Sequence, residues 1–169
     1  MADKKSSVNL DVNCVCKDIV YDGNIELGKG NVIHPKSHFR TKGGPIHIGS
    51  YNIFEERVVI INERKEPLII GDYNLFEVGT LIFSSNVGSN CNFQPRSQAE
   101  PGCKINDNCI IGPKCSIPSN LELPQNTVLY GTNKRRKHIP DVQMHQSLHV
   151  KHLSYLQEYL PKHNNCMHI

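Results

Sequence analysis

The sequence predicts an all-β protein: a parallel β-helix of roughly six or seven triangular coils, followed by one α-helix. Three observations predict this fold. Apolar residues recur at every sixth position, Gly or a small residue recurs at fixed places between them, and one eleven-residue segment is echoed 22 positions later. The low aromatic content, 7% with no Trp, also argues against an ordinary layered α/β core.

The six-residue period is the strongest of these observations. Its longest run has eight consecutive members, and eight matches at one spacing are hard to obtain by chance. The apolar or aromatic positions are Val15, Tyr21, Leu27, Ile33, Phe39, Ile48, Phe54, Ile60, Ile70, Phe76, Ile82, Val87, Phe93, Ala99, Ile105, Ile111, Ile117, Leu123 and Leu129. Interruptions at 41–45 and 62–67 divide the series, and we predict loops there that leave the coil at a corner.

A period of six fits neither an α-helix nor a half-buried strand. It fits a triangular prism in which each flat side is one hexapeptide and the apolar residue points inward. Gly and Asn favour the corners because they tolerate positive φ. Successive coils would stack as parallel strands about 4.8 Å apart, and each coil needs a neighbour to bury its core. Gly follows the apolar residue at Gly28, Gly49, Gly71, Gly88 and Gly112.

The handedness does not follow from the period, since parallel crossovers are usually right-handed. The hexapeptide pattern resembles that of known hexapeptide-repeat proteins, whose solenoids are left-handed. The resemblance therefore implies a single-stranded left-handed parallel β-helix. The echoed segments, 45–55 and 67–77, agree with stacked coils, because an offset of 22 is one 18-residue coil plus four inserted residues.

The composition changes after the repeats: residues 1–133 carry 13 Lys or Arg and 14 Asp or Glu, while residues 134–169 carry six and two. Apolar residues at helical spacing between Pro140 and Pro161 predict an amphipathic helix packed on the prism, with partner or membrane-surface binding as the alternatives. The predicted segments are an N-terminal tail (1–8), the β-helix (9–131), a solvated basic linker (132–141), the helix (142–160) and a C-terminal tail (161–169).

Zinc enzymes of the γ-carbonic-anhydrase class use this kind of coil, so a zinc site has to be considered. Such a site needs convergent imidazoles with one position open for water. Of the nine His, only His34, His38 and His47 lie in the repeats, and none occurs from residue 48 to 137. We therefore predict no metal site and no cofactor.

Acyl transfer is the other enzymatic alternative, and it commonly uses a His as general base. His34 is the candidate, with Asp22 or Glu55 as the orienting carboxylate. Because His34 follows the inward Ile33 and precedes Pro35, we expect it at the surface or a corner. We predict no catalytic residue.

Cysteines and glutamates form two further groups. Cys91, Cys103, Cys109 and Cys115 share the small-residue place of their hexapeptides, so we expect buried, inert thiols there. Glu55 and Glu77 occupy equivalent places in adjacent coils, with Glu56 beside them, and like charges so placed repel unless a basic group or partner intervenes. We expect this ridge to be a solvated face.

Four segments carry a more specific resemblance, in this order along the chain. They are Val32-Ile-His-Pro-Lys-Ser, Gly44-Pro-Ile-His-Ile-Gly, Asn74-Leu-Phe-Glu-Val-Gly and Pro124-Gln-Asn-Thr-Val-Leu-Tyr-Gly. Together with Leu153-Ser-Tyr-Leu-Gln-Glu-Tyr-Leu-Pro-Lys-His near the C-terminus, they resemble the dynactin subunit 6 family over roughly residues 7–163. The 62–67 loop and the C-terminal end are shorter than the family pattern, so a regulatory site in those parts is not implied.

This resemblance implies a non-catalytic adaptor. It implies pairing with dynactin subunit 5 at the pointed end of the complex, next to an actin-related protein, and indirect contact with dynein and membrane cargo. The net charge of +3 predicts no nucleic-acid partner. The sequence contains no signal peptide, no run of about 20 apolar residues and seven Cys that would be reduced thiols, which predicts a cytoplasmic location.

Overall fold

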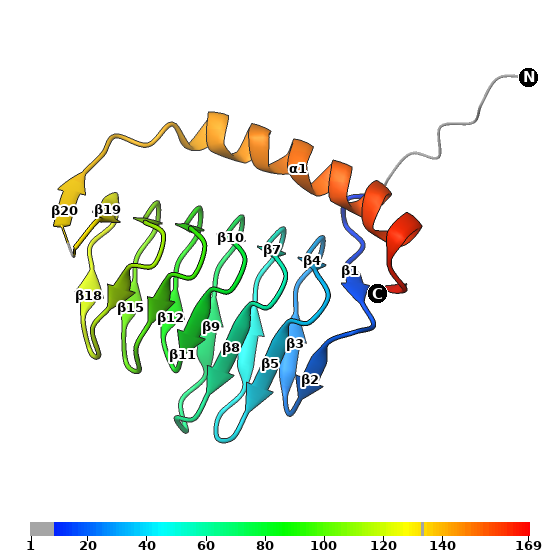
Figure 1. The fold of residues 1–169 in the computed structure, drawn as a ribbon, viewed down its shortest axis with the longest axis horizontal. Helices are drawn as coiled ribbons and strands as arrows, with labels where there is room; N and C mark the ends of the chain where they lie inside the picture. The colour runs from blue at the N-terminus through cyan, green and yellow to red at the C-terminus, as the bar shows by residue number, and fades with distance from the viewer. Residues whose placement is uncertain (1–8, 133) are drawn as a thin grey trace, which may run out of the picture.

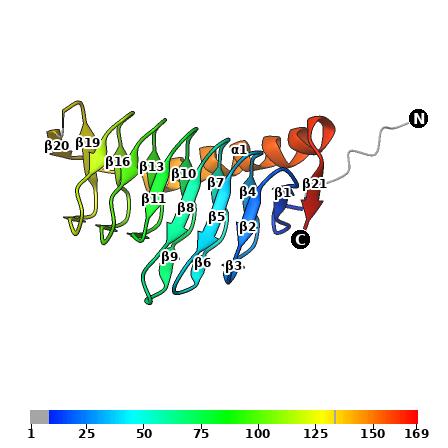
Figure 2. The ribbon, with the colours of Figure 1, turned by 60° about the horizontal axis from the view of Figure 1, so that its bottom comes forward.

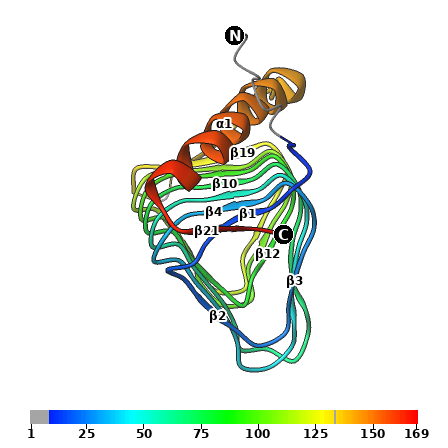
Figure 3. The same ribbon diagram turned by 90° about the vertical axis from the view of Figure 1, so that its right-hand side faces the viewer.

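The computed structural model describes residues 9–132 and 134–169, which form a left-handed β-helix with one long helix on its side. The end view in Figure 3 shows its triangular outline. One side, sheet A, contains β1 (Cys14–Cys16), β4 (Val32–Ile33), β7 (Ile53–Phe54), β10 (Leu75–Phe76), β13 (Asn92–Phe93), β16 (Ile110–Ile111) and β19 (Thr127–Tyr130).

The other two sides are six-stranded parallel sheets. Sheet B contains β2 (Val20–Asp22), β5 (His38–Thr41), β8 (Val59–Asn62), β11 (Leu81–Phe83), β14 (Gln98–Ala99) and β17 (Ser116–Ile117). Sheet C contains β3 (Ile25–Leu27), β6 (Ile46–Ile48), β9 (Leu68–Ile70), β12 (Asn86–Val87), β15 (Lys104–Ile105) and β18 (Glu122–Leu123). The chain visits A, B and C in turn, which makes six coils, within the predicted six or seven.

The inward register is the predicted one. In sheet A, Ile33 lies opposite Phe54, and Phe54 opposite Phe76. The predicted apolar positions are all buried except the first coil's Tyr21, which is 44% exposed, and Leu27, which is partly buried. Phenylalanine rings stack along the axis, with centroids 4.8 Å apart between Phe54 and Phe76 and 5.0 Å between Phe76 and Phe93. The two less buried positions both lie in the first coil, whereas Ile117 and Leu123 of the last coil are fully buried.

The recurring Gly residues are required for a different structural reason from the predicted one. Positive φ at the corners is adopted by Asn90, Asn108 and Asn126, as expected, but also by bulky residues such as Tyr51 and Arg57. The Gly that follows the apolar residue is needed for space instead: a Cβ at Gly49 or Gly71 would lie 2.6 Å from a carbonyl oxygen of the next coil. The positive-φ explanation of these Gly residues is therefore wrong.

The two interruptions are stacked loops at one corner, between sheets B and C, as predicted. Each begins one residue later than expected, because Thr41 and Asn62 still belong to β5 and β8. The buried Asn62 amide donates to the carbonyl oxygens of Gly44, Pro45 and Glu66, at 2.9, 3.1 and 2.9 Å. One side chain thus holds both loops.

The long helix α1 (Val142–His163) lies along the outer surface of sheet A (Figure 1). The Asp141 carboxylate caps it by accepting from the Met144 N–H at 2.9 Å. The stripe of His149, Leu153, Leu156 and Leu160 is buried, whereas Leu148, Tyr155 and Tyr159 are exposed. Across the described ranges, no helix is long and apolar enough to cross a membrane.

The segments around α1 differ from the prediction. The helix continues three residues past 160, and the Asn164 N–H donates to the Leu160 carbonyl at 2.8 Å. The segment predicted as a basic linker contains β20 (Lys134–Lys137), which turns back and pairs antiparallel with β19. The predicted C-terminal tail contains β21 (Cys166–His168), which pairs antiparallel with β1. Figure 2 shows β20 and β21 at opposite ends of sheet A. Pairing satisfies backbone groups that an uncovered sheet edge would leave free.

Candidate functional site

His34, the candidate general base, directly follows β4 at a coil corner, which is one of the two expected places, but it is buried there and only 6% exposed. Its Nδ1 lies 3.0 Å from Oε1 of Glu56, and its Nε2 is buried without a hydrogen-bond partner. Burial opposes ionisation of Glu56, but the His34 hydrogen bond and nearby positive charge lower the pKa of this carboxyl overall.

Neither carboxylate proposed for His34 is its partner. Asp22 pairs with Arg40 at 3.5 Å, and Glu55 accepts from the Val78 N–H at 3.0 Å. The sequence could not select Glu56, because it lies two residues beyond β7, at a coil corner. A general base must reach the proton that it removes, and the remaining nitrogen of His34 is itself buried.

Of the three glutamates expected on a solvated face, Glu56 is exposed, whereas Glu55 and Glu77 are half-buried. Burial raises the pKa of Glu55, and the negative charges of Glu77 and Glu56 raise it further. Burial also raises the pKa of Glu77. These carboxyls therefore remain protonated to a higher pH than carboxyls in water.

The four repeat cysteines are buried, as predicted. A second thiol group was missed: Cys14 and Cys16 on β1 lie beneath α1, and Sγ of Cys16 is 3.3 Å from Sγ of Cys166 on β21. Burial and neighbouring thiols raise the pKa of Cys14 to about 12 and that of Cys16 further still. Thiols held protonated in this way are poor nucleophiles. The Cys-x-Cys spacing was visible in the sequence, but its partner lies 150 residues away.

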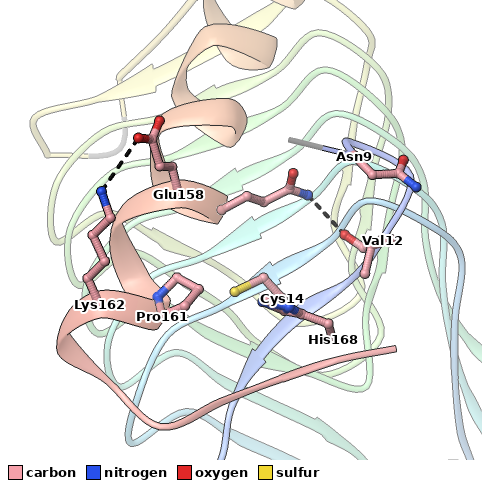
Figure 4. Close-up of a pocket in the computed structure, with 8 residues that line it drawn as sticks. Asn9, Val12, Cys14, Glu158, Pro161, Lys162 and His168 are labelled. Atoms are coloured by element: carbon pink, nitrogen blue, oxygen red, sulfur yellow. Dashed lines mark hydrogen bonds and ion pairs between the residues drawn. The ribbon is translucent and has the colours of Figure 1, made fainter. Parts of the chain in front are cut away.

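A cavity of about 570 Å³ lies at the N-terminal end of the prism, between α1 and the first coil (Figure 4). Its lining includes Cys14, His168, Glu158 and Lys162, and Glu158 pairs with Lys162 at 3.5 Å. Among residues 9–132 and 134–169, no three His, Cys, Asp or Glu side chains are grouped so that they could hold a metal ion.

Contact surfaces are more prominent than reactive groups in this molecule. The outward stripe of α1 includes Met144, Leu148, Tyr155 and Tyr159, which are 42–60% exposed. The four residues of β20 are all exposed and basic. Two surfaces, one apolar and one cationic, therefore face outward on the side that carries sheet A and α1.

No protein-family model matches the chain. The chain is 32% identical over 161 residues to dynactin subunit 6 of Dictyostelium discoideum, and the match covers 92% of this chain and 85% of the relative. It is also 32% identical to dynactin subunit 6 of Nematostella vectensis, over 89% of this chain and 86% of the relative. The corresponding protein of Danio rerio is 31% identical, over 91% and 83%.

Solved structures resemble the chain in fold. A Bacillus cereus protein described as an acetyltransferase has a TM-score of 0.64 at 14% identity, covering 88% of this chain and 92% of that one. A hexapeptide transferase family protein from Anaplasma phagocytophilum has a TM-score of 0.62 at 11% identity, covering 88% and 93%. At such low identity these similarities establish the fold, not the reaction.

Proposed function

Because the chain belongs to the dynactin subunit 6 family, we propose that it is a non-catalytic structural subunit of the dynactin complex. The observation that carries this proposal is the extent of the similarity, 32% identity over 92% of the chain and 85% of a relative with that name. The agreement extends across both the repeats and α1, so it concerns the whole body and not one motif.

The chemistry of the described residues supports a structural role. Two imidazoles lie beside a carboxylate in the described residues. His34 is buried next to Glu56, and its second nitrogen is buried as well, whereas His47 is partly exposed and lies 2.8 Å from Glu26. The thiols of Cys14 and Cys16 have raised pKa values, which disfavours the thiolate form needed for nucleophilic attack. The candidate base His34 is therefore not accessible to an acyl acceptor.

The architecture supports an interaction platform. Stacked coils form a stiff rod in which each coil contacts its neighbours along its whole length. The rod presents flat sides, exposed apolar residues on α1 and strand edges at its ends, all of which are available to other subunits. A rigid body of this kind suits a subunit that sets the spacing between its neighbours.

The finer proposal concerns partners and location. We propose that the chain pairs with dynactin subunit 5 at the pointed end of the complex, beside an actin-related protein. In this position it would help dynein and dynactin to bind membrane cargo, in the cytoplasm and in association with microtubules. The resemblance of the four repeat segments and of the C-terminal helix to this family supports these assignments.

Native mass spectrometry of the complex isolated gently from its own cells tests this proposal. We expect the chain to be recovered with a second hexapeptide-repeat subunit and actin-related proteins. Recovery only as a homotrimer with one metal ion per subunit would overturn the proposal in favour of a γ-carbonic-anhydrase-like enzyme. A His34→Ala variant serves as a control, and we expect it to assemble to the same extent as wild type.

A further inference from the structure

Strand β20 differs in charge and position from the other strands that end the solenoid. It consists of Lys134, Arg135, Arg136 and Lys137, all exposed, and it is the last strand of the nine-stranded sheet A (Figure 1). In the described part of the chain, no strand pairs with its outer edge. At the opposite end of the same sheet, β21 is Cys-Met-His and carries no comparable charge.

The register identifies the backbone groups of β20 that face outward. The His138 N–H donates to the Asn126 carbonyl at 3.0 Å, and Arg136 and Lys134 lie opposite Val128 and Tyr130. Hydrogen-bonded and non-hydrogen-bonded pairs alternate along an antiparallel ladder. The N–H and C=O groups of Arg136 and Lys134 therefore point toward β19, and those of Arg135 and Lys137 point away from the sheet. They form a template for one more strand.

The positive charge of β20 is not neutralised within the chain. None of the ion pairs in residues 9–132 and 134–169 includes a β20 side chain. Lys137 Nζ donates to the Gln125 carbonyl at 2.8 Å and lies 3.4 Å from the Thr127 hydroxyl, which leaves its charge uncompensated. Four unpaired cations on one edge favour an acidic neighbour.

The same charges exclude the simplest alternative occupant. Like charges directly opposite one another destabilise strand pairing, so β20 of a second copy would be repelled. Just beyond the strand, Ile139 is 98% exposed. An apolar side chain fully in solvent beside a cationic edge suits a protein segment, which can cover it, better than a nucleic-acid backbone.

We propose that the outer edge of β20 binds an extended acidic segment of a partner protein, which adds to sheet A as its tenth strand. Main-chain hydrogen bonds to Arg135 and Lys137 would supply the pairing, and alternate acidic side chains would contact the cationic ones, as in other cases of strand addition. The claim that the segment comes from a neighbouring subunit rests on the proposed function. The claim that the outer edge of β20 can bind an acidic strand does not.

The first experiment uses the full chain and a fluorescent ten-residue peptide that alternates Glu with Val or Thr, with binding followed by anisotropy. A control peptide has the same number of Glu but Pro at alternate positions, which removes N–H donors while keeping the charge. We expect the first peptide to bind at least tenfold more tightly than the Pro peptide. Equal affinity of the two peptides would overturn strand addition.

Variants separate the roles of charge and backbone. Replacing all four β20 residues with Glu should weaken binding at least tenfold, whereas replacing the exposed corner residues Lys36, Arg57, Arg96 and Lys114 with Glu should change it less than twofold. In case the first variant unfolds, Arg135→Pro removes an outward N–H without breaking the β19 ladder. We expect Arg135→Pro to weaken binding at least tenfold and Arg135→Gln threefold or less.

Amide hydrogen exchange gives the positional readout. With the acidic peptide bound, exchange at Arg135 and Lys137 should slow, while Lys134 and Arg136 are already protected by β19. Tighter binding of a 20-nucleotide single-stranded DNA than of the peptide would assign the edge to nucleic acid and overturn the proposal. Peptide binding in a chain that is not recovered with dynactin would overturn only the proposed function.

Discussion

One corner of the prism is built in two different ways along its length. The residue two positions before the inward apolar residue of sheet A is Asn in the N-terminal coils (Asn13, Asn31, Asn52 and Asn74) and Cys or Thr in the C-terminal ones (Cys91, Cys109 and Thr127). Asn52 accepts from the N–H of Asn74 at 3.0 Å and donates to Asn31 Oδ1 and the Gly71 carbonyl at 3.1 and 2.9 Å. Asn52, and in the same way Asn31, therefore joins three successive coils.

The cysteine part of the corner fills the same space with weaker bonds. The Cys109 thiol donates to the Pro124 carbonyl at 3.3 Å, and the Cys91 thiol to the Asn106 carbonyl at 3.2 Å. α1 is also buried chiefly against the N-terminal coils, where Leu153, Leu156 and Leu160 pack on Cys14, Val32 and Ile53. The N-terminal half is thus held by a buried polar network and by α1, and the C-terminal half mainly by apolar packing.

The largest expected effect tests what the two halves share, the inward apolar column. Ile111 is fully buried in the C-terminal half, and Ile111→Asp places an unpaired charge inside the prism. This costs several kcal/mol, a large part of the ~5–15 kcal/mol that stabilises most domains, so we expect unfolding. Circular dichroism during a thermal melt measures it. The neighbouring Ile110 faces outward, and Ile110→Asp should still melt cooperatively; a wild-type melt for Ile111→Asp would contradict the register.

The next effect tests the buried hydrogen bonds of the asparagine side chains at this corner. Asn52→Ala leaves the Asn74 N–H and the Gly71 carbonyl without their partner, whereas Asn31 Oδ1 keeps the backbone N–H of residue 52 at 3.0 Å. Each unsatisfied buried group costs about 1–3 kcal/mol, so we expect the free energy of unfolding to fall by about 2 kcal/mol or more in urea titrations. A loss below about 1 kcal/mol would show that water replaces the amide.

The third effect is the loss of stability at low pH that is caused by a buried histidine of α1. His149 donates from Nε2 to the Tyr51 carbonyl at 2.6 Å, and burial lowers its pKa from 6.5 to about 4. The unfolded chain therefore binds more protons between these values, so stability is highest above pH 6.5 and is lost as the pH falls toward 4. At about 1.4 kcal/mol per pH unit, the titration of His149 lowers the free energy of unfolding by about 2 kcal/mol between pH 7 and pH 5.

Comparison with His149→Gln isolates this titration, because other groups also change over the same range. Burial lowers the pKa of His152, which adds to the loss in acid, whereas Glu55 and Glu77 have raised pKa values and oppose it. We expect the free energy of unfolding of the variant to depend less steeply on pH. Identical slopes for wild type and variant would mean that His149 is accessible to solvent.

The smallest effect tests the cysteine part of the corner. Cys109→Ala removes one weak hydrogen bond and a small volume from the interior, which should lower the free energy of unfolding by about 1 kcal/mol. The measurement is the same urea titration as for Asn52→Ala. If the cysteine variant lost as much as the asparagine variant, the contrast between the two halves would not hold.

Much of the fold could be predicted from the sequence because it depends on a local rule applied many times. Each inward residue from Val87 to Leu129 follows the same six-residue spacing, so one wrongly assigned position would not change the assignment of the others. The outer elements obey no repeat. Nothing local in Lys134–Lys137 or Cys166–His168 distinguishes a strand from a polar tail, because their partners, β19 and β1, are supplied by the folded solenoid.

The candidate sites divide in the same way. Burial of the four repeat cysteines followed from their place in the hexapeptide, whereas the partner of His34 depended on how the corner at Glu56 turns. The contact between Cys16 and Cys166 required the chain to return along α1 to its first coil. Long-range contacts of this kind have no spacing that a sequence could display.

The sequence by itself determined the period, the inward column, the place of the two loops and the existence of a C-terminal helix, because each depends on hydrophobic burial at short, regular spacing. Only the tertiary structure decided which stripe of α1 is buried, that His34 is buried beside Glu56, and that β20 and β21 extend sheet A at its two ends. Those outcomes depend on backbone groups and side chains meeting across stacked coils, and the stacking itself creates the surfaces on which they meet.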